Sequence, residues 1–238
     1  MGLPPRILRD AEMISDELNQ LLTSISSSRK VKAEHFLFQE GEDACEMYLI
    51  KSGNVQISKL TSDGKELNLR ICTTNDIIGE LTLFTNNPKY MLSALALQDS
   101  EVLVIKNDIL EEHLLQNAAL TLEFMKWLNN HMRKFQTKIR DLVMNGKKGA
   151  LYSTLIRFSN SYGLETEDGI LIDIHLTNQE FAKFCSATRE SVNRMLNDLK
   201  KQEVLATTSD GRIIIKDLEF LKMEIGCDDC PIEICNIH

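Results

Sequence analysis

The chain has 238 residues, of which 43% are hydrophobic and 26% are charged, so it can bury a folded core and is not expected to be disordered. No apolar run approaches the ~20 residues that cross a bilayer, and the first thirty residues show no secretory pattern. We therefore expect a cytoplasmic protein with no membrane partner, whose six cysteines do not form a disulfide framework. The formal net charge is −8, but residues 126–224 carry 16 basic against 13 acidic side chains, a local excess that favours a polyanionic partner.

The N-terminal part divides into a polar segment of helix and loop at residues 1–30 and a β-rich domain at residues 31–113. Short apolar runs follow one another in the β-rich domain and are separated by glycine-containing turns, which is typical of a small barrel or sandwich. Residues 55–60 and 66–71 flank an Asp-Gly pair at 63–64 and are predicted to form one hairpin.

The next segment, residues 114–145, has the pattern of a long helix that stops at Gly146. Apolar residues recur in it at a mean step close to the heptad value of about 3.5, which gives a narrow seam. The seam consists of Ala118, Leu122, Met125, Leu128, Met132, Phe135, Ile139 and Leu142. Such a helix packs either on the chain's own barrel or on the same helix of a second copy, and the narrow seam and the length favour a homodimer helix.

Residues 148–224 follow the order of a winged helix-turn-helix domain. A helix and a short strand precede Thr177, which begins a Ser/Thr-x-x-Glu capping box with Glu180. The box starts a short helix, and a tight turn, a longer helix over 188–202 and a β-hairpin over 204–215 follow it.

The longer helix divides into an apolar and a polar face. Glu190 and Arg194 lie opposite its apolar stripe, and Arg189 lies in its first turn. Arginine can pair with guanine O6 and N7, and glutamate can accept from cytosine N4, so this trio is suited to reading G·C pairs in the major groove. An ordinary surface helix with a Glu190–Arg194 ion pair is the alternative, but the capping box, turn and hairpin favour DNA recognition.

The tail, residues 225–238, contains Cys227, Cys230 and Cys235 in a C-x2-C-x4-C run. Clustered thiols are suited to bind an iron–sulfur cluster or zinc, because a reducing cytosol disfavours a disulfide and adjacent free thiols are prone to oxidation. The spacing does not separate the two, since His238 could complete a Cys3His zinc site. The remaining cysteines are expected to be ordinary core or boundary thiols: Cys45, Cys72 and Cys185.

The order of β-roll, long helix and winged helix-turn-helix resembles the cyclic-AMP receptor protein/fumarate–nitrate regulator (Crp/Fnr) family over nearly the whole chain. The resemblance rests on Ile78-Gly79-Glu80-Leu81, on the segment 41–53 and on Arg189-Glu190-Ser191-Val192-Asn193-Arg194. It implies an α+β fold with a cupin-like β-roll of cyclic-nucleotide-binding type, in a homodimeric transcription regulator that is not an enzyme. It further implies that double-stranded DNA and RNA polymerase are partners. The implied DNA site is a TGTGA-like palindrome read by Arg189, Glu190 and Arg194, with Asn193 as a further contact.

One position departs from the family members that bind cyclic AMP. Those members follow Gly-Glu with an Arg-Ser or Arg-Thr pair that holds the phosphate, and the same distance from Gly79-Glu80 leads here to Tyr90-Met91. Tyrosine supplies no cation and methionine no hydroxyl, so a buried phosphate would lack a charge partner. We therefore expect no cyclic AMP, and we expect Glu80 to be structural. The alternative function is a family regulator that senses another small ligand in the β-roll and holds a structural zinc in the tail.

Three cysteines at the extreme C-terminus resemble the Bacillus-type fumarate–nitrate regulators within this family. That resemblance implies an oxygen-labile [4Fe-4S] cluster on Cys227, Cys230 and Cys235, with an aspartate at the end of the dimer helix, here Asp141, as the fourth ligand. It further implies an oxygen-responsive regulator of anaerobic genes that is active on DNA while it holds the cluster.

From the residues alone, the fourth ligand has rivals in Asp228, Asp229 and Cys185. Asp141 could instead be a solvated helix residue paired with a neighbouring Lys138 or Arg140. If Asp141 is the ligand, Asp141→Ala is expected to weaken cluster retention and to leave the apoprotein folded.

Overall fold

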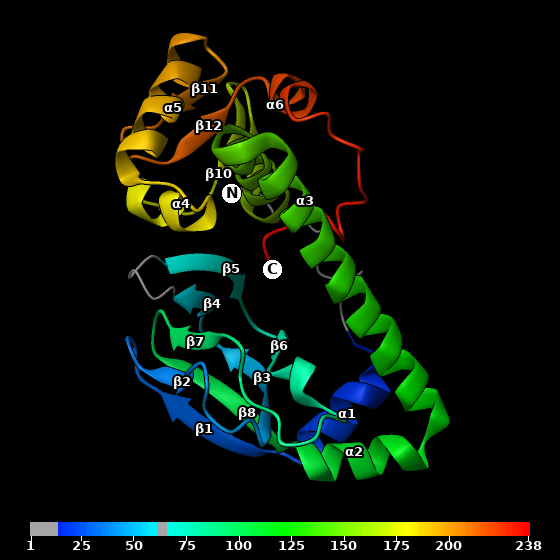
Figure 1. Ribbon diagram of the computed structural model, residues 1–238. Helices are drawn as coiled ribbons and strands as arrows, with labels where there is room; N and C mark the ends of the chain where they lie inside the picture. Colours follow the sequence, from blue (N-terminus) through cyan, green and yellow to red (C-terminus); the bar gives the residue numbers. More distant parts are fainter. Residues whose placement is uncertain (1–13, 61–65) are drawn as a thin grey trace. The chain divides into compact units, whose positions relative to one another are not determined.

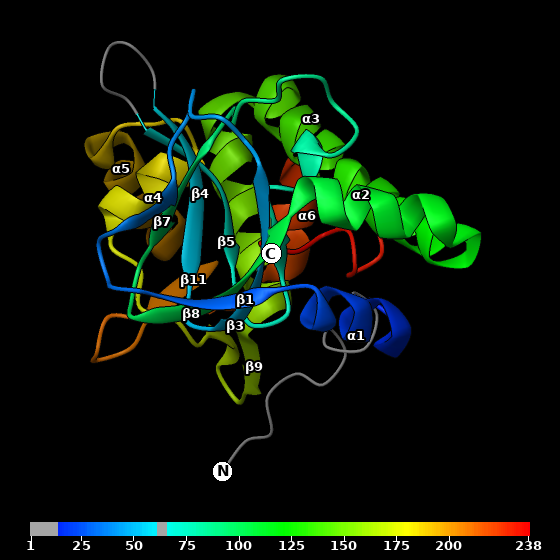
Figure 2. The same cartoon turned by 90° about the horizontal axis from the view of Figure 1, so that it is seen from below.

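The computed structural model describes residues 14–60 and 66–238, which divide into two compact units, one within residues 13–130 and one within 131–237. The turn expected at 63–64 lies outside the described residues. Figures 1 and 2 show the elements of both units. None of the described helices is long and apolar enough to cross a bilayer.

The first unit is a β-roll of two four-stranded antiparallel sheets. One sheet has the strand order β1-β8-β3-β6 and the other has the order β2-β7-β4-β5. The elements are α1 (Asp16–Ser24), β1 (Ser27–Val31), β2 (Phe36–Phe38), β3 (Glu46–Ser52), β4 (Val55–Leu60), β5 (Glu66–Cys72), β6 (Ile77–Ile78), a 3-10 turn (Glu80–Thr82), β7 (Ser93–Ala96), β8 (Ser100–Lys106) and α2 (Asn107–Gln116).

Both faces of strand β3 are covered, which explains its continuous apolar run. Tyr48 and Ile50 point into the core between the two sheets. Met47 and Leu49 point the other way, into a second core formed with α1, α2 and the start of the long helix α3. The cores thus follow the two-residue period of the strand.

The long helix α3 (Ala118–Tyr162) begins later than the expected residue 114, and it consists of two helical segments that meet at Gly146. Asn117 interrupts the helical path, since its backbone is extended and its side-chain oxygen accepts from the N–H groups of Ala119 and Leu120. Residues 107–116 therefore form the separate helix α2. The helical path is interrupted at Gly146, the predicted stop, where the backbone takes non-helical angles (φ 57°, ψ −157°) and two helical segments meet in a kink.

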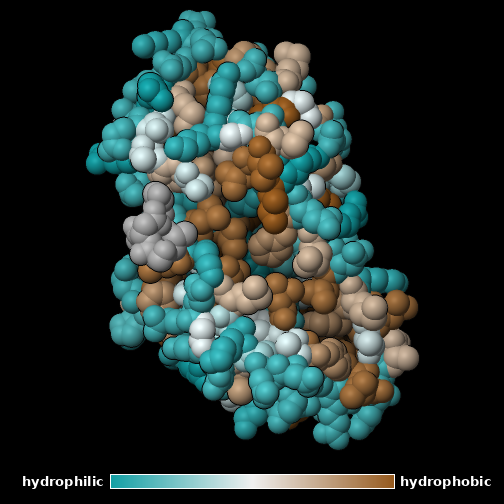
Figure 3. All heavy atoms as spheres, in the orientation of Figure 1, coloured by the Kyte–Doolittle hydropathy of each residue, from teal (hydrophilic) through white to brown (hydrophobic). Residues whose placement is uncertain are grey.

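Large hydrophobic side chains are exposed where α2 meets α3, and they appear as brown residues in Figure 3. Leu122 and Met125, two members of the predicted seam, are 54% and 59% exposed. Leu120 and Phe124 lie on the inner side of the same helix and are buried in the core of the first unit. The helix therefore uses a different stripe, and not the seam, to pack on its own unit.

The second unit contains the rest of α3, a four-stranded sheet of order β11-β12-β10-β9, and the helices of the winged domain. Phe158 of α3 packs edge-on against Phe181 and Phe184, with ring centroids 5.6 and 5.3 Å apart. The elements are β9 (Gly163–Thr166), β10 (Gly169–Ile172), α4 (Asn178–Phe184), α5 (Arg189–Lys201), β11 (Leu205–Thr207), β12 (Ile213–Ile215) and α6 (Leu218–Glu224).

Candidate functional site

The helix-turn-helix begins with the expected capping box. The Thr177 hydroxyl accepts from the backbone N–H of Glu180, and the Glu180 carboxylate accepts from the backbone N–H of Thr177 at 2.6 Å. Ser186 takes left-handed angles (φ 48°) in the turn, and Thr188 caps α5 by accepting from the N–H of Ser191. The sequence therefore fixes both helix starts through local side-chain contacts.

Helix α5 presents the predicted base-reading residues to solvent. Arg189, Glu190, Asn193 and Arg194 are all exposed, on the side opposite the buried apolar stripe. Within the described part of the chain, Glu190 and Arg194 do not form the ion pair of the alternative interpretation. Asn178 of α4 donates to Asn193 Oδ1 at 3.0 Å, a contact that the sequence did not reveal. Asn193 Oδ1 therefore accepts a hydrogen bond from within the helix-turn-helix.

In the β-roll, Glu80 is buried in an ion pair. Arg70 Nη2 lies 3.3 Å from both Glu80 carboxylate oxygens and donates to the Ile77 carbonyl at 3.1 Å. The two side chains are only 6% and 4% exposed. Although burial opposes it, the nearby Cys72 and Glu80 raise the pKa of Arg70, so the guanidinium is charged. Glu80 therefore has the structural partner that its expected role requires.

Tyr90 is part of the β-roll core. It is 5% exposed, its ring stacks on Phe38 with centroids 3.8 Å apart, and its hydroxyl donates to the Glu46 carbonyl at 2.6 Å. Burial raises the pKa of Tyr90, which keeps the hydroxyl neutral. Met91 is 76% exposed. Neither side chain places a cation inside the β-roll.

The three cysteines outside the tail differ in burial. Cys185 is fully buried, its Sγ lies 3.8 Å from Thr154 Oγ1, and burial raises its pKa to about 12. Cys72 is also fully buried. Cys45 is exposed, so the expectation of a core or boundary position is wrong for that residue.

The tail thiols lie near one another and near Asp141. Cys227, Cys230 and Cys235 are each half-buried. Burial raises the pKa of Cys235, the adjacent Arg157 lowers it, and Cys227, Cys230 and Asp141 raise it further. The other three predicted ligands therefore act electrostatically on Cys235. No group of three or more His, Cys, Asp or Glu side chains among residues 14–60 and 66–238 is arranged to hold a single metal ion.

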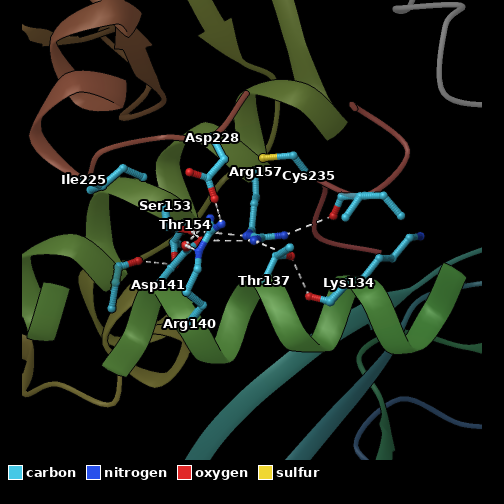
Figure 4. A network of polar contacts seen from close by, with 12 residues as sticks. Lys134, Thr137, Arg140, Asp141, Ser153, Thr154, Arg157, Ile225, Asp228 and Cys235 are labelled. Carbon is cyan, nitrogen blue, oxygen red and sulfur yellow. Dashed lines mark hydrogen bonds and ion pairs between the residues drawn. The ribbon is translucent and has the colours of Figure 1, made fainter. Parts of the chain in front are cut away.

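Asp141 lies at the centre of a buried polar network (Figure 4) and is 5% exposed. Its Oδ1 accepts from Arg140 Nε and Nη2 at 3.1 and 2.8 Å. Its Oδ2 accepts from Ser153 Oγ at 2.6 Å and from Arg157 Nη2 at 3.1 Å. Asp141 is therefore not a solvated helix residue, although it does pair with Arg140.

The rival oxygen ligands lie at the surface of the tail. The Asp228 carboxylate is 66% exposed and pairs with Arg140. The Asp229 carboxylate is 77% exposed and lies 3.3 Å from Lys222 Nζ.

Sequence inspection did not single out Arg157, whose side chain is 3% exposed. It belongs to the stretch 151–159 of α3, in which every residue is buried. A lone arginine in an apolar helix is the signal that could have found it, because a buried charge needs a partner.

Two family models match the chain. Residues 28–117 match the cyclic nucleotide-binding domain, and residues 150–224 match the Crp-like helix-turn-helix domain. The chain is also 61% identical over 228 residues to the "Anaerobic regulatory protein" of Bacillus subtilis, a match that covers 96% of each chain. It belongs to the Crp/Fnr family of transcription regulators.

This Crp/Fnr regulator also resembles more distant proteins. It is 27% identical to the lactate racemization regulatory protein of Lactiplantibacillus plantarum, over 90% of this chain and 100% of the relative. A solved CooA mutant from Carboxydothermus hydrogenoformans matches with a TM-score of 0.76 and 24% identity, over 92% of this chain and 97% of that one. The c-di-GMP responsive global regulator CLP of Xanthomonas campestris matches with a TM-score of 0.73 and 18% identity, over 85% of this chain and 100% of that one. The last two likenesses show the fold.

The comparisons confirm the α+β fold predicted from the sequence, with a cyclic-nucleotide-binding-type β-roll, a long helix and a winged helix-turn-helix. This Crp/Fnr regulator belongs to a family of transcription regulators and not of enzymes, and it binds DNA through the helix-turn-helix of α4 and α5.

Proposed function

We propose that this Crp/Fnr regulator is a homodimer that responds to oxygen and controls anaerobic genes, and that it binds TGTGA-like palindromes while its tail holds a [4Fe-4S] cluster. The observation that carries the proposal is that Arg157 donates both to Asp141 and to the carbonyls on either side of Cys235, in the same unit as α4 and α5. The 61% identity to a relative named for anaerobic regulation supports it.

The donor set fits an iron–sulfur cluster. Thiolates are the usual protein ligands of such clusters, and each ligand binds a different iron, so the ligands need not meet at one point. Cys227, Cys230 and Cys235 would hold three irons, and the Asp141 carboxylate would complete the set. When bound, the cluster supplies the oxygen-sensitive group of the sensor.

The chain's own residues link this site to the DNA-binding helices. Asp141 lies in α3 before the kink at Gly146, and its Oδ2 accepts from Ser153 and Arg157 of the segment beyond the kink. Phe158 of that second segment packs against Phe181 and Phe184 of α4. The tail follows α6 directly after the winged domain. Thiols and Asp141 held together would therefore fix the tail against α3, the helix on which α4 packs. To act as a switch, the bound state must favour the DNA-competent arrangement by a few kcal/mol.

Dimerisation through the α3 seam is part of the proposal. None of the eight seam residues is buried in its own chain, so the seam can pack on a second copy. A symmetric dimer places two recognition helices in half-sites ~34 Å apart. Arg189, Glu190, Asn193 and Arg194 then read base edges, and RNA polymerase is the partner of the DNA-bound dimer.

The β-roll is proposed to be a scaffold that takes no cyclic AMP. Glu80 is already paired with Arg70, and the Tyr90-Met91 position gives a phosphate no cation. The proposal keeps the segments predicted from the sequence. They are the N-terminal segment 1–30, the β-roll 31–113, the dimerisation helix 114–145, the DNA-binding domain 148–224 and the cluster-binding tail 225–238.

The test is to purify the protein without air, to measure iron, sulfide and zinc, and to record the visible spectrum before and after oxygen. About four irons and four sulfides per chain, with colour that bleaches in air, are expected. Zinc at about one per chain without colour would contradict the proposal and favour a structural zinc with a ligand in the β-roll.

A further inference from the structure

Arg157 uses its whole guanidinium to join the tail to α3. Nε donates to Ser153 Oγ at 3.2 Å, and Nη2 donates to Thr137 Oγ1 and Asp141 Oδ2, both at 3.1 Å. Nη1 donates to the carbonyls of Ile234 and Asn236, at 3.2 and 3.4 Å. These five contacts match the five N–H donors of arginine.

The two carbonyls bound by Arg157 flank Cys235, and α3 holds the backbone around this cysteine at further points. Asn160 Nδ2 donates to the Cys235 carbonyl at 2.6 Å. Ser161 Oγ accepts from the Ile237 N–H at 3.0 Å. The backbone that presents the Cys235 thiol is therefore fixed by α3 side chains and needs no bound group to take this path.

The two oxygens of Asp141 have different surroundings. Oδ2 faces Ser153 and Arg157, which are both buried. Oδ1 is held by Arg140, whose side chain is 37% exposed and also pairs with Asp228 in the tail. The half-exposed Arg140 side chain can leave Asp141 for solvent and still pair with Asp228, whereas the buried Arg157 side chain has no solvent to move into.

We propose that Arg157 is the positioning residue of the cluster site: it holds Asp141 by Oδ2 and Cys235 by its flanking carbonyls, and so sets the distance between these two ligands. Arg140 is the displaceable cap of Oδ1, the oxygen that turns to iron. The inference rests on the proposed function, in which Asp141 and Cys235 are ligands of the same cluster.

A merely structural role for Arg157 makes a different prediction. A buried ion pair that only stabilises the fold would alter the unfolding transition and leave the ligand set of any bound cluster unchanged. The positioning role alters the ligand set and the order of the tail in a folded protein. Arg157→Gln is the test variant, because Asp141 keeps Arg140 as a charge partner. Arg140→Gln is the matched control, since it removes the same charge from the other oxygen of the same carboxylate.

The first measurement uses the full-length apoprotein and follows backbone hydrogen exchange at residues 234–237. Arg157→Gln is expected to speed exchange by roughly tenfold or more, because two hydrogen bonds to the tail are lost. Arg140→Gln is expected to match wild type at these amides. Equal exchange in wild type and Arg157→Gln would overturn the tail-holding role.

The second measurement is Mössbauer spectroscopy of protein loaded with iron and sulfide without air. In wild type and Arg140→Gln, one iron site is expected to differ from the three thiolate-bound sites, as an oxygen ligand requires. In Arg157→Gln this distinct site is expected to change its parameters or to be lost as iron, while the three thiolate-bound irons persist. An unchanged distinct site in Arg157→Gln overturns the inference and leaves the proposed function intact.

If wild type binds no iron and sulfide, the proposed function fails, and the inference fails with it. If Arg157→Gln does not fold, Arg157→Lys and Asn160→Ala give the answer. Lysine keeps the charge but cannot contact Asp141 and both carbonyls together, so the altered iron site is still expected. Asn160→Ala removes only the contact to the Cys235 carbonyl, so faster tail exchange with an unchanged Asp141 iron site is expected. Wild-type behaviour in both variants overturns the inference.

Discussion

Two buried arginine–carboxylate pairs, Arg70–Glu80 in the β-roll and Arg157–Asp141 in the second unit, are built alike. The arginine side chains are 6% and 3% exposed, and the carboxylates are 4% and 7% exposed. A cysteine thiol lies close enough to each arginine to interact with it electrostatically.

The surroundings of the two pairs differ in what they leave accessible. The thiol beside Arg70 is Cys72, which is fully buried and stands apart from the other cysteines in sequence. The thiol beside Arg157 is Cys235, which is half-buried and lies near two more thiols. Under the proposed function, the Arg70–Glu80 pair is structural, whereas the Arg157–Asp141 pair supports a binding site because half-buried thiols lie beside it.

Replacing the two thiols should give the largest difference. Cys235→Ser is expected to abolish cluster assembly, because a serine hydroxyl is a poor substitute for a thiolate ligand. Cys72→Ser is expected to keep the wild-type iron and sulfide content. The measurement is iron and sulfide per folded chain after anaerobic reconstitution. Equal loss in both variants would show that the thiols matter through folding.

Truncating the two carboxylates should give equal losses of stability and unequal losses of cluster. Asp141→Ala and Glu80→Ala each remove the carboxylate that pairs with a buried arginine, so each is expected to lower the free energy of unfolding of the apoprotein by ~3–5 kcal/mol. This loss of stability adds to the expectation that Asp141→Ala weakens cluster retention and leaves the apoprotein folded. Denaturant titration measures the stability, and iron content at low temperature measures the cluster. If Glu80→Ala lost the cluster and Asp141→Ala retained it, the assignment of Asp141 as a ligand and of Glu80 as structural would be contradicted.

Changing the predicted base-reading residues should weaken DNA binding without changing the amount of cluster bound. Arg189→Ala and Arg194→Ala are each expected to cost ~1–3 kcal/mol of DNA binding and to relax the choice at one base pair. Cluster content should stay at the wild-type value, since both side chains are exposed on α5. Fluorescence anisotropy on a TGTGA palindrome and on single-base variants measures this. A uniform loss on all sequences would assign these arginines to phosphate contacts.

The smallest expected effect is that of the capping box. Thr177→Ala removes the hydroxyl that caps α4 and is expected to cost ~1 kcal/mol of stability. DNA affinity at low temperature should change little, because Thr177 only starts the helix. Thermal unfolding of the apoprotein measures the loss, and Thr177→Ser, which keeps the hydroxyl, is the control.

Local signals in the sequence predicted much of the second unit. The capping box at Thr177 and the amphipathic division of the next helix gave α4 and α5 to within a residue or two. Strand β1 was missed because four of its five residues are exposed, so no two-residue alternation is visible. The break at Asn117 was missed because an asparagine cap inside a helical pattern has no glycine or proline to mark it.

The candidate site was predictable only where its residues are close in sequence. The close spacing of the three tail cysteines predicted them as ligands, and the resemblance to the family implied Asp141 as the fourth. Arg157 lies 16 residues from Asp141 and 77 from Ile234, and only the fold brings them together. The Arg70–Glu80 pair likewise joins strand β5 to the 3-10 turn ten residues later, a contact that no local pattern predicted.

The most direct test of the central claim is the DNA affinity of one anaerobic preparation before and after a measured exposure to air. The affinity for a TGTGA palindrome is measured by fluorescence anisotropy, with iron and sulfide determined on the same sample and circular dichroism to confirm that the protein stays folded. We predict that specific binding is lost in step with the cluster and returns when iron and sulfide are restored without air. Specific binding that is unchanged after all iron has been lost would contradict the claim that the tail cluster controls this regulator.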